Sequence, residues 1–372
     1  MSDAPIIFFA GGGTGGHLYP GVAVAESLRK ILPQARSVFL TTGRPIDQVI
    51  LKPTGFDSIT QPIVPPQWSF RFWNSWRKTH GLLRTLLKDL RPALVLGLGG
   101  YAAGVAVKLA ARHGVPTALI NPDVIPGKAN RWLLPRVRKA FCQFEETAEH
   151  VPAGERSKLV VTGCPIRADL QHLSDRAAAM ANWGLKPELK TLVVTGASQG
   201  AKTVNEAVVE VFSTFRPSGW QVLHLAGQDH GEAVAAGYQK SADPIPHRVV
   251  PFTSDMADVW AIADLAVSRS GASSCAELTA CGVPSILLPY PFHKDMHQRL
   301  NAQALQERGG AELIDDQRDA KANAQRLQPI LQTLMTDDPQ RQNMATAAKK
   351  MGRPGAADAV AGELVKLIGL DR

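Results

Sequence analysis

The sequence predicts an α/β protein made of two doubly wound, parallel-sheet domains. Short apolar runs rich in Val, Ile and Leu alternate with longer stretches whose apolar residues recur at helical spacing, a pattern typical of βαβ units. The length of 372 residues exceeds what one ordinary hydrophobic core supports, so two domains are expected. The predicted strands are Ile6–Phe9, Ser37–Leu40, Leu94–Leu96, Thr117–Ile120, Leu159–Val161, Thr191–Val194, Gln221–Leu225, His247–Val250, Leu265–Val267 and Ser285–Leu288.

The strands form two series, and the break between them lies near residues 162–165, after which a polar helical stretch begins. We therefore predict one domain over residues 1–163 and a second over residues 164–348. Residues 349–372 end in a helix with apolar residues at helical spacing. The pattern of this helix alone does not decide which domain it packs on.

Composition narrows the class of protein. The chain is 45% hydrophobic and 20% charged, as in globular proteins. It has no run of about 18 apolar residues, so no transmembrane helix is expected. Its N-terminus lacks the basic and apolar regions of a signal peptide. Its four cysteines form no CxxC pair, which favours reduced, buried thiols over disulfides or zinc ligands.

The positive charge is concentrated in the first half of the chain. The whole protein carries +8, whereas residues 1–165 contain 20 Lys+Arg and 10 Asp+Glu and carry +10. This imbalance indicates an anionic partner for the first domain: a phosphate, a nucleic acid or an acidic membrane surface. No nucleic-acid recognition motif accompanies the charge, so a nucleic-acid partner is not expected.

A glycine-rich turn, Gly11–His17, joins the first predicted strand to a predicted helix. Such a turn binds anions, because glycines let the backbone approach closely and the first N–H groups of the helix point at the ligand. His17 ends the turn, where it could take a proton from a bound group. The alternative is that His17 only hydrogen-bonds the ligand or fixes the loop.

Two stretches resemble nucleotide-binding motifs but lack a feature that each motif requires. Gly11-x-Gly13-x-x-Gly16 spells the dinucleotide fingerprint, but the stretch after the second strand ends in threonines instead of the acidic residue that holds the ribose. This argues against a nicotinamide cofactor. The turn at residues 195–203 resembles a P-loop, but the spacing from Gly196 to Lys202 is wrong, which argues against ATP hydrolysis.

Similar turns follow other strands in both domains. Residues 97–104 are glycine-rich, and residues 268–278 place small side chains before a predicted helix. A helix N-terminus of this kind can hold a diphosphate and stabilise it as a leaving group. Glu277 lies in that helix and could accept hydrogen bonds from a ribose diol, or it could simply complement the helix dipole.

An aromatic and basic segment covers residues 67–78. It contains Trp68, Phe70, Trp73 and Trp76 among Arg and Lys residues and leads into a helix with a leucine stripe. The leucines are expected in the core. Aromatic side chains interleaved with cations suit the headgroup level of an anionic bilayer, so we predict that this segment docks on a membrane surface without spanning it.

Together these motifs resemble the MurG family of bacterial N-acetylglucosaminyltransferases, and the similarity runs nearly end to end. Each motif alone is weak, but their common order and spacing are specific. The matching motifs are Gly11–His17 with Pro20, Gly97-x-Gly99-Gly100-Tyr101-x-x-Gly104, Ile125-Pro126-Gly127-x-x-Asn130-Arg131, Thr162-Gly163-x-Pro165-Ile166-Arg167, Ser198-Gln199-Gly200-Ala201 with Asn205, Phe252-x-x-Asp255-Met256, Arg269-Ser270-Gly271-Ala272 with Glu277, and Asp295-x-His297-Gln298 with Asn301.

The resemblance implies a GT-B fold, in which two Rossmann-like domains face a cleft and the C-terminal helix returns to the first domain. It implies transfer of GlcNAc from UDP-GlcNAc to the C4 hydroxyl of MurNAc in lipid I, with inversion, to give lipid II. It also implies a peripheral protein on the cytoplasmic face of the bacterial inner membrane, and leaves contacts with other cell-wall synthesis or division proteins open. No cofactor is implied. No Asp-x-Asp metal motif accompanies the predicted donor site, so backbone dipoles are expected to stabilise the leaving group.

The resemblance also assigns residues. His17 is the candidate catalytic base, since inverting transfer needs a base on the acceptor hydroxyl and no protein nucleophile. The implied donor residues are Phe252 and Thr253 at the uracil, Glu277 at the ribose, Ser198, Ala272 and Ser273 at the diphosphate, His297 and Gln298 at the GlcNAc, with Arg167 and Asn205 at the border. The implied acceptor residues are Thr14, Gly15, Gly16, Tyr101, Asp123 and Asn130.

The chain departs from the family pattern in the first domain. Asp123 stands where an asparagine is usual and follows Pro122, while Pro45 and Asp47 replace a glycine and a glutamate. The family pattern therefore supports the acceptor assignment less strongly than the donor assignment. The competing hypotheses are a GT-B enzyme with another lipid acceptor, a UDP-GlcNAc 2-epimerase, and a non-catalytic scaffold that binds sugar nucleotides. The membrane-docking segment argues against the epimerase, which needs no lipid.

Overall fold

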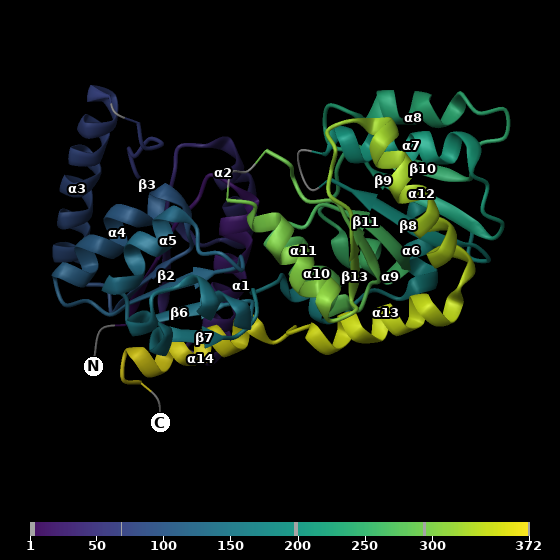
Figure 1. Ribbon diagram of the computed structural model, residues 1–372. Coiled ribbons are helices and arrows are strands. Elements are labelled where there is room, and N and C mark those ends of the chain that lie inside the picture. The colour runs from purple at the N-terminus through teal and green to yellow at the C-terminus, as the bar shows by residue number, and fades with distance from the viewer. Residues whose placement is uncertain (1–3, 68, 197–199, 293–294, 371–372) are drawn as a thin grey trace. The chain divides into compact units, whose positions relative to one another are not determined.

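The computed structural model describes residues 4–67, 69–196, 200–292 and 295–370. Its internal contacts divide the chain into two compact units (Figure 1). Unit 1 comprises Met1–Arg167 and Arg353–Arg372, and unit 2 comprises Ala168–Gly352. The boundaries expected from the sequence, after residues 163 and 348, each lie four residues before the boundaries of these units, after residues 167 and 352.

Unit 1 is a seven-stranded parallel sheet with strand order β3-β2-β1-β4-β5-β6-β7. Its strands are β1 (Ile6–Ala10), β2 (Arg36–Thr41), β3 (Asp57–Thr60), β4 (Leu94–Gly97), β5 (Thr117–Asn121), β6 (Lys139–Cys142) and β7 (Leu159–Val161). Its helices are α1 (Gly15–Ile31), α2 (Pro45–Leu51), α3 (Phe70–Leu90), α4 (Gly100–Arg112), α5 (Lys128–Leu133) and α14 (Ala356–Leu367). Short 3₁₀ helices cover Lys52–Thr54, Leu134–Arg136, Glu145–His150 and Ala153–Lys158.

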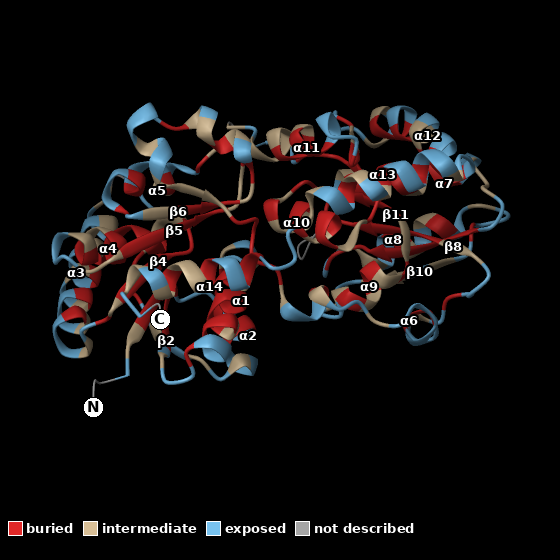
Figure 2. Ribbon diagram, turned by 90° about the horizontal axis from the view of Figure 1, so that it is seen from below, coloured by how far each residue is buried: buried red, intermediate tan, exposed pale blue. Residues whose placement is uncertain are grey.

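Helices cover both faces of this sheet. Because successive side chains of a strand point to opposite faces, β1 contributes residues to two core clusters. Phe8 and Ala10 of β1 lie in the core cluster that includes residues of α3, α4 and α5. Ile7 and Phe9 lie in the cluster that includes residues of α1, α2 and α14. The strands are therefore buried while the outer helix surfaces are exposed (Figure 2).

The last helix, α14, packs on α1 in unit 1. Val360 and Leu364 are fully buried in the core cluster of β1 and α1. The Ser27 hydroxyl donates to Asp358 Oδ1 at 2.6 Å, and Lys139 forms an ion pair with Glu363. The apolar stripe that the sequence shows in this segment is thus the buried face of the helix.

Unit 2 is a six-stranded parallel sheet with strand order β10-β9-β8-β11-β12-β13. Its strands are β8 (Lys190–Thr195), β9 (Trp220–Leu225), β10 (His247–Val250), β11 (Ala263–Ser268), β12 (Ser285–Leu287) and β13 (Ala311–Leu313). Its helices are α6 (Arg176–Trp183), α7 (Lys202–Thr214), α8 (Gly231–Gln239), α9 (Met256–Ile262), α10 (Ala272–Cys281), α11 (His297–Glu307), α12 (Ala320–Thr336) and α13 (Asp338–Met351), with a 3₁₀ turn at Ala168–Gln171.

The predicted α/β class with two doubly wound parallel sheets is confirmed, but three strands escaped the sequence prediction. The strand β3 is polar and largely exposed at the edge of its sheet. The interior strand β6 follows Lys139 with Ala, Phe and Cys and has no β-branched residue, and the edge strand β13 has Glu312 at its centre. None of the three therefore shows the run of Val, Ile and Leu that marks a buried parallel strand.

Candidate functional site

The strand order reverses between β1 and β4 in unit 1, and ligands of open α/β sheets bind at such a switch point, beyond the carboxyl ends of the strands. The loop after β1 leads into α1, and the loop after β4 leads into α4. Both are the glycine turns that the sequence analysis identified. The backbone of the two loops therefore lines the place where this sheet is expected to hold a ligand.

His17 lies in the first turn of α1 and packs over the second loop. A Cβ atom on Gly99 would lie 3.0 Å from the imidazole Cδ2, and one on Gly100 would lie 3.1 Å from Cε1. Both glycines have positive φ, +102° and +70°, which other residues rarely adopt. The Thr14 hydroxyl lies 3.0 Å from His17 Nδ1. Glycine is thus required at both positions for the histidine to sit here.

The surroundings of His17 keep it neutral near pH 7. Burial lowers the pKa of the imidazole below its ordinary value, while the charge of Asp123, the carbonyl of Gly12 and the charge of Asp47 act in the opposite direction without reversing the shift. A neutral imidazole can accept a proton. The protonation state is therefore the one that a general base needs.

Asp47 secures the first glycine loop, a role that the sequence analysis missed. Its carboxylate is fully buried and accepts hydrogen bonds from Gly13 N at 2.6 Å, Thr42 N at 2.8 Å and Thr42 Oγ1 at 2.6 Å. Arg44 adds a bond from Nη1 to the Gly13 carbonyl at 3.0 Å. The sequence showed Asp47 only as a departure from the family pattern, because its partners lie elsewhere in the chain.

The remaining predicted acceptor residues surround this switch point in unit 1. Gly15 and Gly16 open α1, Tyr101 is half-buried in the first turn of α4, and Asp123 is half-buried in the loop after β5. Asn130 is buried, and its amide donates to the Ile120 carbonyl at 3.0 Å and to Asn121 Oδ1 at 3.1 Å. Its Oδ1 atom lies 4.0 Å from the position of a Cβ on Gly99, so Asn130 borders the histidine loop.

Unit 2 has its own switch point, between β8 and β11. The loop after β11 leads into α10, where Gly271 is the N-cap residue and provides no side-chain cap, and no acidic residue lies in the first turn. Ala272 is buried and Ser273 is half-buried at this helix start. A helix N-terminus flanked by small side chains is suited to a phosphate group. Ser198, predicted at the same diphosphate, lies outside the described residues.

Three further predicted donor residues of unit 2 lie on α10 and in the loop after β10. Glu277 on α10 is half-buried, and its Oε2 accepts a hydrogen bond from Trp260 Nε1 at 2.9 Å, which orients the carboxylate. Phe252 is 46% exposed in the loop after β10. In the same loop, Thr253 Oγ1 accepts from the Asp255 amide at 2.9 Å, closing a tight turn.

Asn205 is buried on α7, and its side-chain amide is engaged within unit 2. Its Nδ2 donates to the Ala226 carbonyl at 2.8 Å, and its Oδ1 lies 3.1 Å from His224 Nε2. Burial, together with His247, lowers the pKa of His224 to about 3. Since an amide oxygen only accepts, Nε2 of this neutral ring carries the hydrogen, and Nδ1 accepts from Tyr238 at 3.0 Å. Asn205 thus fixes the loop after β9.

Gln298 is held at the start of α11 by two neighbouring segments. Its Oε1 accepts from the Tyr290 amide at 2.9 Å, and its carbonyl accepts from the Ser270 hydroxyl at 2.8 Å. Asn301, one turn later, donates to the Ser270 carbonyl at 3.2 Å. The start of α11 is therefore tied to the loop that precedes α10.

A buried guanidinium joins several loops of unit 2, a role that no pattern in the sequence indicates. Arg269 Nη1 donates to the carbonyls of Leu288 and Pro289, at 2.9 and 3.0 Å, and to Asp316 Oδ2 at 2.7 Å. Its Nη2 donates to Thr203 Oγ1 at 2.9 Å. Arg269 thus connects the loops that follow β11, β12 and β13 with the first turn of α7.

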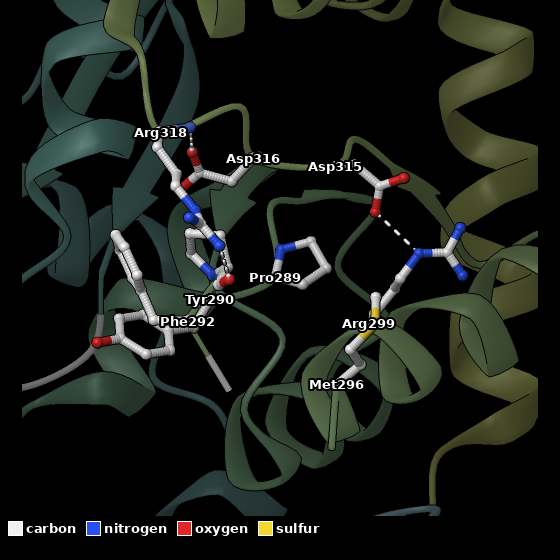
Figure 3. A pocket seen from close by; sticks show the side chains of 9 residues that line it. Pro289, Tyr290, Phe292, Met296, Arg299, Asp315, Asp316 and Arg318 are labelled. Carbon is white, nitrogen blue, oxygen red and sulfur yellow. Dashed lines mark hydrogen bonds and ion pairs between the residues drawn. The ribbon is translucent and has the colours of Figure 1, made fainter. Parts of the chain in front are cut away.

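The pocket in Figure 3 is a cavity of about 480 Å³ in unit 2. It is lined by Pro289, Tyr290, Pro291, Phe292, Met296, Arg299, Asp315, Asp316 and Arg318. The Arg318 guanidinium lies 4.6 Å from the centre of the Phe292 ring, and Arg299 Nε pairs with Asp315 Oδ1 at 2.9 Å. The predicted donor residues that the structure describes do not line this cavity.

Arg167 does not belong to the unit that carries the other predicted donor residues. It ends the first segment of unit 1, with its guanidinium 5.4 Å from the centre of the Tyr19 ring. The predicted donor residues that the structure describes in unit 2 are Asn205, Phe252, Thr253, Ala272, Ser273, Glu277, His297 and Gln298. A role for Arg167 at the donor therefore remains a proposal.

The aromatic segment is only partly exposed. Phe70 and Trp73, in the first turn of α3, are 87% and 53% exposed. Trp76 is half-buried, packs on the core and contacts Trp132 of α5 edge to face, with the ring centroids 6.3 Å apart. Trp68 lies outside the described residues. No helix in the part of the chain that the structure describes is long and apolar enough to cross a membrane.

Comparison with known proteins identifies the class. Residues 7–142 match the glycosyltransferase family 28 N-terminal domain, and residues 191–360 match the C-terminal domain of the same family. The first match covers β1 to β6 with the switch point of unit 1, and the second covers the sheet and the switch point of unit 2 and reaches into α14. The chain is therefore a glycosyltransferase with the two-domain GT-B fold.

The relatives identify the family more narrowly. A UDP-N-acetylglucosamine–N-acetylmuramyl-(pentapeptide) pyrophosphoryl-undecaprenol N-acetylglucosamine transferase from Halothermothrix orenii is 34% identical over 360 residues, 94% of this chain and 95% of the relative. MurG from Acinetobacter baumannii has a similar structure, with a TM-score of 0.77 at 25% identity, over 97% of this chain and 99% of the other. The chain belongs to this MurG family of N-acetylglucosaminyltransferases.

The fold alone is shared more widely. A UDP-GlcNAc 2-epimerase from Neisseria meningitidis aligns over 97% of this chain and all of its own length, with a TM-score of 0.70 at 14% identity. At that identity the likeness reports the fold and nothing more. Sequence similarity along the whole chain, rather than fold, therefore separates the transferase from the epimerase.

Proposed function

We propose that this protein transfers GlcNAc from UDP-GlcNAc to the C4 hydroxyl of MurNAc in lipid I, inverting the anomeric centre and yielding lipid II. The observation that carries the proposal is the position of His17 at the switch point of unit 1, packed against Gly99 and Gly100, where burial also lowers the pKa of its imidazole. Its place among the loops that the family motifs assign to the acceptor supports a role in deprotonating the acceptor hydroxyl.

In the proposed reaction, the C4 oxygen attacks the anomeric carbon while His17 accepts its proton. The bond from that carbon to the diphosphate oxygen breaks, and UDP departs with the bonding electrons. The N-terminus of α10, at Ala272 and Ser273, stabilises the charge that develops on the diphosphate. Ser198 would complete this diphosphate site.

The other proposed donor contacts are those that the resemblance to the family implies. The Glu277 carboxylate, oriented by Trp260, accepts hydrogen bonds from the ribose hydroxyls. The backbone at Phe252 and Thr253 meets the uracil, and His297 and Gln298 meet the GlcNAc. Asn205 supports the donor site through the loop after β9, and Arg167 borders it.

On the acceptor side, the N–H groups of Gly15 and Gly16 at the start of α1 meet the pyrophosphate of lipid I. Thr14 and Tyr101 meet the acceptor's pyrophosphate and sugar. Asp123 and Asn130 line the same region from the loop after β5 and from α5.

The lipid acceptor implies work at a membrane surface, and we propose that unit 1 docks on the anionic cytoplasmic face of the inner membrane. The exposed Phe70 and Trp73 provide amphipathic insertion, and the exposed cations Arg71, Arg77 and Lys78 provide attraction to anionic lipids. Trp76, being half-buried, contributes more to the core than to the membrane.

The test is incubation with UDP-GlcNAc in the presence and absence of lipid I. The proposal predicts lipid II only when lipid I is present, and no UDP-ManNAc in either case. UDP-ManNAc formed without acceptor would make the protein an epimerase. Transfer to a different polyprenyl-linked sugar would correct the acceptor, and UDP-GlcNAc binding without turnover on either acceptor would indicate a scaffold.

A further inference from the structure

The turn that leads into α11 has an unusual backbone. Met296, the N-cap residue of α11, has φ +50° and ψ +26°, the left-handed conformation that non-glycine residues rarely adopt. Such strained positions cluster at ligand sites, where the surrounding structure maintains them. Met296 is 51% exposed and lines the cavity of Figure 3, while the residues on either side of it in the chain, Asp295 and His297, contact each other.

The contact fixes the imidazole of His297. Asp295 Oδ1 lies 2.7 Å from His297 Nδ1, and the two side chains are 36% and 23% exposed. An ionised carboxylate can only accept a hydrogen bond, so Nδ1 must carry the hydrogen. In the neutral ring the lone pair then lies on Nε2, which becomes a hydrogen-bond acceptor.

The next residue is fixed with the opposite polarity. Gln298 Oε1 accepts from the Tyr290 amide at 2.9 Å, so the remaining polar group of the side chain is its NH₂, a donor. The carbonyl of Gln298 also accepts from Ser270 at 2.8 Å, which holds the residue against the loop before α10. Two adjacent residues therefore combine one acceptor nitrogen with one donor amide.

We propose that Asp295 is a positioning residue that sets the hydrogen-bonding polarity of the sugar site. It holds His297 as an acceptor for a sugar hydroxyl, while the Gln298 amide donates to a neighbouring sugar oxygen. The inference rests on the proposed function, which places these two side chains at the GlcNAc. It adds a selection rule: the sugar must donate a hydrogen bond to His297 and accept one from the Gln298 amide.

The selection rule follows because binding weakens when a donor faces a donor, or an acceptor faces an acceptor, at His297. If the hydrogen were on Nε2 instead, the ring would donate to the sugar hydroxyl, and the hydrogen of that hydroxyl would need another acceptor. The carboxylate of Asp295 would then face the lone pair of Nδ1. The charged carboxylate favours the tautomer with the hydrogen on Nδ1, because it can only accept from that nitrogen. Loss of the carboxylate is therefore expected to weaken binding of the sugar by about tenfold or more.

The first test reads the tautomer directly by ¹⁵N NMR of the histidine side chains at pH 8, where an ordinary imidazole is neutral. The His297 signals are assigned by their loss in His297→Gln. The proposal predicts a protonated Nδ1 and an unprotonated Nε2 in the wild type, and a reduced Nδ1–H population in Asp295→Asn. A wild-type ring protonated on Nε2 would overturn it.

The second test compares the affinities for UDP-GlcNAc and UDP by calorimetry, without acceptor. Asp295→Asn is expected to weaken UDP-GlcNAc binding about tenfold and to leave UDP, which lacks the sugar, within twofold. The matched control is Asp315→Asn, which removes the carboxylate beside Arg299 at the cavity and should change neither affinity. Equal losses for both ligands, or no loss, would overturn the proposal.

A double-mutant cycle separates positioning from general support of the loop. If Asp295 acts through the imidazole, Asp295→Asn has no further effect on UDP-GlcNAc affinity in the His297→Gln background. Additive effects would show that the carboxylate acts in another way. If UDP-GlcNAc fails to bind the wild type, the proposed function is refuted, whereas a wrong tautomer with normal binding refutes only this inference.

Discussion

Replacing Asp47 by Ala tests the acceptor side of unit 1, because one buried carboxylate accepts three hydrogen bonds there. The side chain of Asp47 is fully buried. Its removal would leave three donors without their acceptor: Gly13 N, Thr42 N and Thr42 Oγ1. A buried donor without a partner costs about 1–3 kcal/mol. Taking the lower value for each donor gives a loss of about 3 kcal/mol in the free energy of unfolding, offset in part because the charge need no longer be desolvated.

The assay is urea unfolding of the whole chain followed by tryptophan fluorescence. The matched control is Asp57→Ala, which removes an exposed ion pair with Arg36 and is expected to cost less than about 1 kcal/mol. Asp47→Ala should also reduce turnover on lipid I while leaving UDP affinity unchanged, since its partners belong to the His17 loop. A loss of stability no greater than that of Asp57→Ala would refute the account of this loop.

Three further predictions concern the pH dependence, the donor and the membrane. Because burial lowers the pKa of His17, kcat/KM should rise with pH through a midpoint below 6.5. The variant Asp123→Asn removes a charge that raises this pKa, so it should move the midpoint to lower pH. A midpoint that moves to higher pH would contradict the assignment of His17 as the base. Glu277→Ala should weaken UDP binding about tenfold in calorimetry without changing the KM for lipid I, and equal effects on both would argue against ribose recognition. Phe70→Ser combined with Trp73→Ser should reduce sedimentation with anionic vesicles at unchanged UDP affinity, and loss of UDP binding would count against a docking surface.

The fold was accessible from the sequence where strands are buried on both faces. The strands β1, β4 and β8 carry continuous apolar runs, and the glycine turns after β1 and β4 mark the carboxyl edge of the sheet. The strand β3 could not be found in this way, because an edge strand facing solvent has no apolar run. Its pairing with β2 depends on the fold as a whole.

The candidate site was accessible only in part, because motifs identify residues near a ligand but not the residues that hold them. Asp47 accepts from Gly13, 34 residues away, as well as from the nearby Thr42, and Arg269 donates to Thr203, 66 residues away; no local pattern records these contacts. Asn205 was predicted at the donor border, whereas its amide is engaged with Ala226 and His224. Trp76 was predicted on the membrane surface, but its contact with Trp132 could only be seen in the folded chain.

The central claim is that His17 takes the proton of the acceptor hydroxyl, and its most direct test is the turnover of His17→Ala at saturating UDP-GlcNAc and lipid I. The matched control is His113→Ala, an exposed histidine at the end of α4. Loss of a general base lowers the rate by about 10²- to 10⁴-fold, and the account predicts a loss of this size with UDP affinity unchanged. Turnover in His17→Ala equal to that in His113→Ala would contradict it.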